Sequence, residues 1–287
     1  MTENTTPTQQ YGTAAQSTVQ ELPYPSCQVP TRVTRLPDPD SPGPQPRKWR
    51  PSITWIVLTL NVLVWAVDAL LAFAYLHIAG EPHYYPLLEW GAKSNALILE
   101  GQLWRLVTPI FLHVGIIHLA FNTYALYMIA PQIECFYGPH RFLIIYMLSG
   151  IYGVLFSFAL SPAPSAGASG AILGLIGTQA AFFFRYRNAF GERGRRQFYG
   201  TVAVIAINMV LTFSASGIDI WGHLGGLFIG AILGWTLMPR YALVGEEKER
   251  SLVDLNHVGR WGIAVGGAIL VFVLSTWLTI VTQNASI

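Results

Sequence analysis

The chain has 287 residues, of which 52% are hydrophobic and 11% are charged, and its formal net charge is +2. Soluble domains carry about 25% charged residues. The composition therefore excludes an ordinary soluble domain and indicates an integral membrane protein.

Residues 1–50 differ in composition from the rest of the chain. They hold half of the 18 prolines, together with many Ser and Thr residues, and they contain no apolar run. Such a segment buries too little apolar surface to fold alone, and it lacks the pattern of a signal peptide. We predict a disordered, proline-rich tail.

Seven apolar runs beyond the tail are long enough to span a bilayer as helices. They predict an all-α membrane protein with a six-helix core over 51–240, a linker over 241–260 and one extra C-terminal transmembrane helix within 261–287. The insert at about 80–110 carries prolines, aromatic residues and charges, so we expect it at the membrane interface. The predicted spans are 51–78, 112–133, 141–160, 168–184, 198–214, 221–238 and 261–282.

The Lys and Arg residues predict the orientation, because cytoplasmic loops near helix ends are enriched in them. With seven spans, every Lys and Arg except Lys93 and Arg105 falls on the same side of the membrane. We therefore predict a multi-pass protein of the cell membrane with a cytoplasmic N-terminus and an external C-terminus.

Two polar side chains, Ser169 and His223, stand beside glycines inside segments of spanning length. Ser169 precedes Arg185 by 16 residues, and His223 precedes Arg240 by 17. At about 1.5 Å of rise per residue, both lie about 24–25 Å above the cytoplasmic boundary. A polar side chain at such a depth points to a function, and the equal depths predict a shared site.

Small residues recur at four-residue spacing on the two helices that carry this pair. Such stripes permit the backbones of neighbouring helices to approach closely. Helix packing alone would explain them, but a short hydrogen bond between Ser169 and His223 requires the same close approach. The stripes consist of Gly170, Gly174 and Thr178 on one helix and of Gly222, Gly226, Gly230 and Gly234 on the other.

These two residue types suit nucleophilic catalysis. A serine hydroxyl attacks a carbonyl when a base takes its proton, and histidine is the usual base. Ser169 also follows a loop rich in Ser, Pro and Gly, so its backbone N–H and the helix dipole can face a developing oxyanion. The alternative is that Ser169 only caps its helix.

His118 and Asn122 lie four residues apart, which places both side chains on one face of a helix. Asn122 falls near the depth of Ser169, so these two side chains are candidate hydrogen-bond donors to an oxyanion. The alternative is a buried polar pair that joins helices, which is common in membranes.

Together these motifs resemble the rhomboid family of intramembrane serine proteases. The resemblance covers about residues 51–240 and depends on residues from several separate helices. The motifs are Trp104-Arg105, His113, His118 with Asn122, Glu134 to Gly138, Gly167-Ala168-Ser169-Gly170, and His223 followed by Gly226 and Gly230.

The resemblance implies a six-plus-one arrangement and cleavage of transmembrane proteins near the external face by a Ser-His dyad. It makes Ser169 the nucleophile and His223 the base, with His118, Asn122 and the Ser169 N–H at the oxyanion. Trp104 and Arg105 would shape the interfacial loop. The segment at 198–220 would gate lateral entry from the bilayer. No cofactor, metal ion or nucleic-acid partner is expected, and the sequence does not indicate an oligomeric state.

Two departures from the family pattern bear on the candidate site. Many members carry an aromatic residue one turn after the serine, where it packs on the histidine ring, but this chain has Leu173. Asp219 precedes His223 by four residues, which suggests a catalytic triad; we expect instead an acid in a solvated loop.

Three other classes of membrane protein fit the sequence less well. The chain has no His-Glu-x-x-His motif and no pair of aspartates within its spans, which argues against zinc and aspartyl proteases. A catalytically silent rhomboid-like protein would bind client transmembrane helices without cutting them, but the retained Ser169, His223 and Asn122 argue against it. A transporter would need a polar path to both faces, whereas the buried polar residues gather near one.

Overall fold

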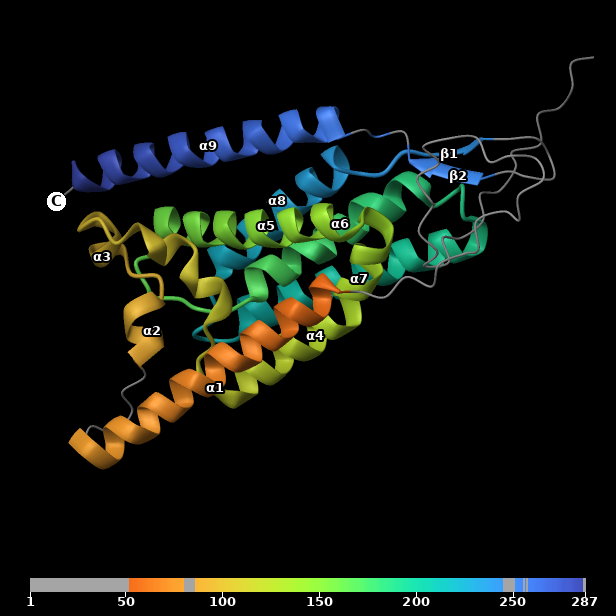
Figure 1. Ribbon diagram of the computed structural model, residues 1–287. Helices are drawn as coiled ribbons and strands as arrows, with labels where there is room; N and C mark the ends of the chain where they lie inside the picture. Colours follow the sequence, from red (N-terminus) through yellow and green to blue (C-terminus); the bar gives the residue numbers. More distant parts are fainter. Residues whose placement is uncertain (1–51, 80–85, 245–250, 255, 257, 286–287) are drawn as a thin grey trace, which may run out of the picture.

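The computed structural model describes residues 52–79, 86–244, 251–254, 256 and 258–285. The predicted tail over residues 1–50 and part of the predicted linker lie outside the described residues. Helices occur at all seven places where the apolar runs predicted them (Figure 1). They are α1 (Ile53–Ala79), α4 (Gly115–Tyr137), α5 (Pro139–Leu160), α6 (Ser169–Tyr186), α7 (Gly191–Ser214), α8 (Ile220–Thr236) and α9 (Val258–Asn284).

The number of membrane spans stays a prediction. Among the described residues, α1, α5, α7 and α9 contain segments long and apolar enough to cross a bilayer, while α8 is apolar but shorter. α4 includes Pro131, Gln132 and Glu134, and α6 includes Gln179 and Arg185. Polar residues of this kind lower the hydropathy of helices that other helices surround.

The insert between α1 and α4 consists of short helices rather than a further long one. It contains α2 (Pro86–Gly91), α3 (Asn95–Leu99) and the 3-10 helices η1 (Leu103–Leu106) and η2 (Thr108–Phe111). None of these is long enough to span a membrane.

A two-stranded hairpin lies within the predicted linker. Strand β1 (Tyr241–Val244) pairs antiparallel with β2 (Ser251–Asp254), with Tyr241 opposite Asp254. The sequence analysis did not anticipate these strands, because four-residue segments are too short to show a clear period. The part of the chain that forms the helix bundle is all-α, as predicted.

Helix α6 is the centre of the bundle, and residues 171–179 are buried without interruption. A helix buried on all sides must be surrounded by other helices, and α4, α5, α7 and α8 all contact it. The extra helix α9 lies outside, along α5 (Figure 1). It is attached there by the Tyr152 hydroxyl, which donates to the Ala268 carbonyl at 2.6 Å.

Helices α6 and α8 pack backbone against backbone, as the small-residue stripes predicted. A Cβ atom added at Gly226 would overlap the backbone of Gly170, and one added at Gly230 would overlap that of Gly174. One turn further, the Thr178 hydroxyl donates to the Gly230 carbonyl at 2.8 Å. These contacts fix both the separation and the register of the two helices.

The start of α1 is attached to the end of α4 by one carboxylate. Glu134 is fully buried and accepts hydrogen bonds from the backbone N–H groups of Ser52, Ile53 and Thr54 at 2.8–3.0 Å. The Thr54 hydroxyl donates to it as well, at 2.6 Å. N–H groups in the first turn of a helix have no partner within the helix, and Glu134 supplies one.

Trp104 and Arg105 hold the insert together. The buried Arg105 guanidinium donates to the carbonyls of Ala92 and Glu89 at 2.7 and 2.8 Å. The Trp104 indole donates to the Trp90 carbonyl at 3.0 Å. Both side chains therefore bind carbonyls at the C-terminal end of α2, which have no partner within that helix.

The insert also fixes the loop that leads into α6. Lys93 and Ser165 exchange two backbone hydrogen bonds, at 2.9 and 3.3 Å, and the Gly167 N–H donates to the Pro109 carbonyl at 2.9 Å. The fully buried Lys93 ammonium donates to the carbonyls of Ser161 and Ala163 at 2.6 and 2.8 Å. The position of Ser169 is therefore set from both sides, by α8 and by the insert.

The backbone contact between α6 and α8 gives a first prediction. Gly230→Ala should destabilise the protein by about 1–3 kcal/mol, because the new methyl group meets backbone that cannot move aside. Thermal unfolding in detergent should show this as a fall of several degrees in Tm. Gly266→Ala is the matched control in α9, where an added Cβ meets nothing within 4 Å. Equal Tm values for the two variants would contradict the packing argument.

A second prediction concerns Lys93. Lys93→Met should lower Tm at pH 7 by at least about 4 °C, because two loop carbonyls lose charged donors. Thermal unfolding of the two proteins at matched pH measures the difference. A Tm that does not change would show that the loop keeps its place without the ammonium.

The same substitution has a defined dependence on pH. Burial lowers the pKa of Lys93 to about 8, although the negative charge of Asp219 opposes this shift. Between about pH 8 and the ordinary lysine value near 10.5, the unfolded chain binds this proton and the native protein does not, so the native state gains stability as pH rises. The Tm advantage of wild type over Lys93→Met should therefore grow from pH 8 to pH 10.

Candidate active site

The Ser169 hydroxyl is hydrogen-bonded to the imidazole of His223. Ser169 Oγ lies 2.7 Å from His223 Nε2. Ser169 is the first residue of α6, where the N-cap is Ala168 and no side chain caps the helix. Ser169 therefore does not cap its helix, and that alternative is wrong.

His223 lies in the first turn of α8, which begins after a true side-chain cap. The Asp219 carboxylate accepts a hydrogen bond from the Gly222 N–H at 2.9 Å, and the His223 N–H donates to the Asp219 carbonyl at 3.0 Å. The expectation that Asp219 is a solvated loop acid was wrong, because the half-buried carboxylate serves as the N-cap of α8. The suggested triad is also absent at this position.

The second ring nitrogen of His223 meets a residue that the sequence analysis did not consider. His223 Nδ1 lies 2.9 Å from the Thr212 hydroxyl oxygen, near the C-terminal end of α7. A single threonine in an apolar helix gives no signal in the sequence. The contacts of Lys93 were also missed, although Lys93 did carry a signal, since it is one of only two Lys and Arg residues predicted on the external side.

His118 lies close to the serine. A Cβ atom added at Gly167 would come within 2.7 Å of His118 Cε1 and within 3.6 Å of Ser169 Oγ, and Gly167 has a φ of +147°. Both the space and the backbone conformation therefore require glycine here. The His113 ring lies edge-on to the His118 ring, with 5.3 Å between centroids.

Asn122 lies one turn further along α4 and is buried. Its side-chain amide donates to the His118 carbonyl of its own helix at 3.2 Å. An amide group carries two N–H donors, so this bond leaves the second donor available to a ligand. The structure thus places the serine, His223 and His118 together, with Asn122 on the same helix face as His118.

A small cavity of about 30 Å³ adjoins the Ser-His pair. Its walls include Ser165, Gly167, Asp219 and the pair itself. A cavity of this size with polar walls is large enough to hold a water molecule. The site therefore has space for the second reactant of a hydrolysis.

The remaining motif residues support the pair indirectly. Gly170 and Gly226 meet backbone against backbone where α6 packs on α8. Leu173, one turn after Ser169, is buried and aliphatic, so it offers no ring to stack on the imidazole. The orientation of His223 depends instead on hydrogen bonds at its two nitrogens.

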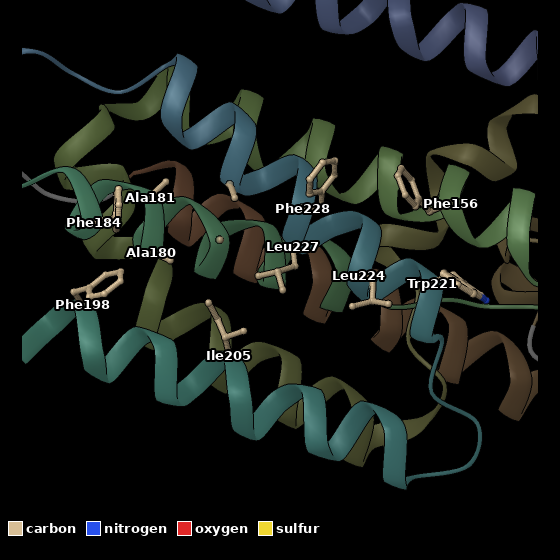
Figure 2. A pocket seen from close by; sticks show the side chains of 12 residues that line it. Phe156, Ala180, Ala181, Phe184, Phe198, Ile205, Trp221, Leu224, Leu227 and Phe228 are labelled. Carbon is tan, nitrogen blue, oxygen red and sulfur yellow. The ribbon is translucent and has the colours of Figure 1, made fainter.

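Helices α7 and α8 are separated by an open apolar groove along much of their length (Figure 2). The groove has a volume of about 670 Å³. Ile205 of α7 faces Leu227 of α8 across it, while Phe198 of α7 lies beside Phe184 of α6, with 5.8 Å between the two ring centroids. The packing of α8 against α7 is thus much looser than its packing against α6.

Geometry of this kind can activate a serine. The Nε2 atom is within hydrogen-bond reach of the hydroxyl whose proton it would take. The N–H of Ser169 has no acceptor within its own helix, because the first N–H groups of a helix are left without one. An oxyanion near this N–H would also meet the positive end of the α6 dipole.

Over much of its length this chain is similar to known proteins. The family model described as Rhomboid domain matches residues 100–240. Rhomboid protease GluP of Bacillus subtilis is 42% identical over 208 residues, which cover 69% of this chain and 37% of GluP. Rhomboid-like protease 3 of Toxoplasma gondii is 33% identical over 186 residues, covering 64% of this chain and 68% of that protein.

A third relative is Rhomboid protease AarA of Providencia stuartii. It is 31% identical over 178 residues, which cover 53% of this chain and 63% of that protein. The chain therefore spans well under half of GluP but about two thirds of the other two. On the strength of the matched domain and of these relatives, this membrane-embedded helical chain belongs to the rhomboid family.

Proposed function

We propose that this protein is an intramembrane serine endopeptidase that cleaves transmembrane proteins. The observation that carries the proposal is the 2.7 Å contact between Ser169 Oγ and His223 Nε2. The names of the relatives support it, since each of the three described above is called a protease.

In the proposed reaction, Ser169 Oγ attacks the carbonyl carbon of the scissile peptide while His223 Nε2 takes the hydroxyl proton. The tetrahedral intermediate carries a negative oxygen, which the Ser169 N–H, His118 and Asn122 stabilise. The C–N bond then breaks as His223 returns its proton to the leaving amine. Water, activated by the same imidazole, hydrolyses the acyl-enzyme and frees Ser169.

We further propose that cleavage occurs near the external membrane face. Support comes from the distribution of Lys and Arg, which predicts a cytoplasmic N-terminus and an external C-terminus. Lys93 and Pro109 of the insert, which bind the loop before Ser169, then lie on the external side. Residues 198–220, in α7 and the loop after it, would admit substrates sideways from the bilayer.

The domain arrangement follows the same proposal. Residues 51–240 form the proteolytic core, 241–260 link it to the extra helix, and 261–287 contain that helix and an external C-terminus. The hairpin of β1 and β2 occupies part of the link. The tail over residues 1–50 would remain in the cytoplasm.

A third prediction tests the dyad. Ser169→Ala and His223→Ala should each reduce cleavage of a helix-destabilised transmembrane peptide by at least about a thousandfold, because nucleophile and base act as a unit. The assay uses purified protein in proteoliposomes and parallel labelling with a fluorophosphonate probe. Ser275→Ala in α9 and His140→Ala at the start of α5 are matched controls that should keep wild-type rates.

Two outcomes would count against the proposal. Cleavage by Ser169→Ala would refute the nucleophile assignment. A wild-type protein that binds transmembrane peptides but neither cuts them nor reacts with the probe would favour the alternative, a catalytically silent rhomboid-like binder.

A fourth prediction concerns the oxyanion. Asn122→Ala should lower kcat by about 100-fold with little change in KM, since the lost donor acts mainly in the transition state. Steady-state kinetics on the same peptide measure both constants, and Tm should stay near wild type. An unchanged kcat would remove Asn122 from the oxyanion site while leaving the dyad intact.

A further inference from the structure

Thr212 is buried where its neighbours are not. It is 2% exposed, whereas Leu211 and Phe213 beside it are 56% and 62% exposed. In this part of α7 the apolar side chains thus face outward and the polar one faces the bundle. A hydroxyl buried among helices needs a hydrogen-bond partner, and this one lies at His223 Nδ1, 2.9 Å away.

The contact bears on the tautomer of His223. If Nε2 is to accept the Ser169 proton, the hydrogen of the neutral ring must be on Nδ1. Thr212 Oγ1 then accepts the hydrogen bond from Nδ1–H. The carboxylate nearest in sequence, that of Asp219, accepts from the Gly222 N–H instead.

In the family pattern, an aromatic residue one turn after the serine packs on the histidine ring. This chain has no such ring at that position. Leu173 stands one turn after Ser169 and has no aromatic ring. Away from Thr212, α7 and α8 are separated by the apolar groove (Figure 2). The Thr212 hydroxyl therefore bridges two helices that otherwise pack loosely.

We propose that Thr212 is a positioning residue for the reaction, which holds the His223 ring from α7 through Nδ1 so that Nε2 faces Ser169. This inference deepens the proposed function and rests on it. The Thr212 hydroxyl contacts the imidazole at Nδ1, and it acts on the reaction through the ring.

The test compares three variants in the peptide-cleavage assay. Thr212→Val keeps the shape of the side chain and removes the hydroxyl, and it should lower kcat about tenfold with KM within twofold of wild type. Thr212→Ser restores a hydroxyl and should return kcat to within about threefold of wild type. The rate of fluorophosphonate labelling should follow kcat in each case.

Thr279→Val is the matched control. Thr279 lies on α9, outside the segment proposed to admit substrates, and it donates its hydroxyl to the Ser275 carbonyl of its own helix at 2.8 Å. It should keep wild-type kcat. If Thr212→Val does not fold, Thr212→Ala removes the same hydroxyl with a smaller side chain.

The outcomes separate this inference from the proposed function. An active wild type with Thr212→Val equally active overturns the positioning role alone. A Thr212→Ser variant as slow as Thr212→Val also overturns it, because the hydroxyl would then not matter. A wild type without any cleavage overturns the proposed function and this role together.

Discussion

The close approach of α6 to α8 is the constraint on which the rest of the structure depends. Gly170 meets Gly226 and Gly174 meets Gly230 through backbone atoms, and the Thr178 hydroxyl reaches the Gly230 carbonyl. Contacts at successive turns prevent one helix from sliding or rotating against the other. Ser169 and His223 stand at the end of this contact, so backbone packing sets the distance between them.

Hydrogen bonds to the loop before Ser169 also help to fix the site. The loop before Ser169 has little regular structure, and irregular backbone at membrane depth is tolerated only where protein or water satisfies it. Lys93 and Pro109 of the insert supply partners for this loop. Arg105 and Trp104 in turn hold the insert. Residues of the insert thus fix the start of α6.

The sequence predicted those parts of the architecture that depend on the local spacing of residues. Apolar runs predicted where helices lie, and four-residue glycine spacing predicted the contact of α6 with α8. It placed the start of α7 at residue 198, whereas the helix begins at Gly191. The residues at 192–196, most of them charged, form helix before the apolar stretch begins. Hydropathy alone does not detect such a charged turn.

The missed residues have two different causes. Asp219 caps its helix through the nearby Gly222 N–H, and an aspartate before an apolar helix is a signal that the sequence does carry. Thr212 and Lys93 act through partners that only the tertiary structure brings close. In the sequence, Thr212 is a threonine within an apolar stretch. Lys93 is one of the charges from which the orientation of the chain in the membrane was predicted. Their roles depend on which carbonyl or ring nitrogen faces them, and no single-chain pattern of spacing contains that information.

The neutral Thr212 hydroxyl beside His223 has a physical advantage over a charged group among membrane helices. A carboxylate at Thr212 would bind the Nδ1–H more strongly, but a charge buried among membrane helices carries a large desolvation cost unless it is well paired. A hydroxyl accepts the same hydrogen bond at far lower cost. Asp219 shows the complementary arrangement, since its carboxylate is only half-buried and caps a helix N-terminus, where backbone donors and the dipole favour negative charge. The acid therefore orders the helix that carries His223, and a neutral side chain from α7 holds the ring.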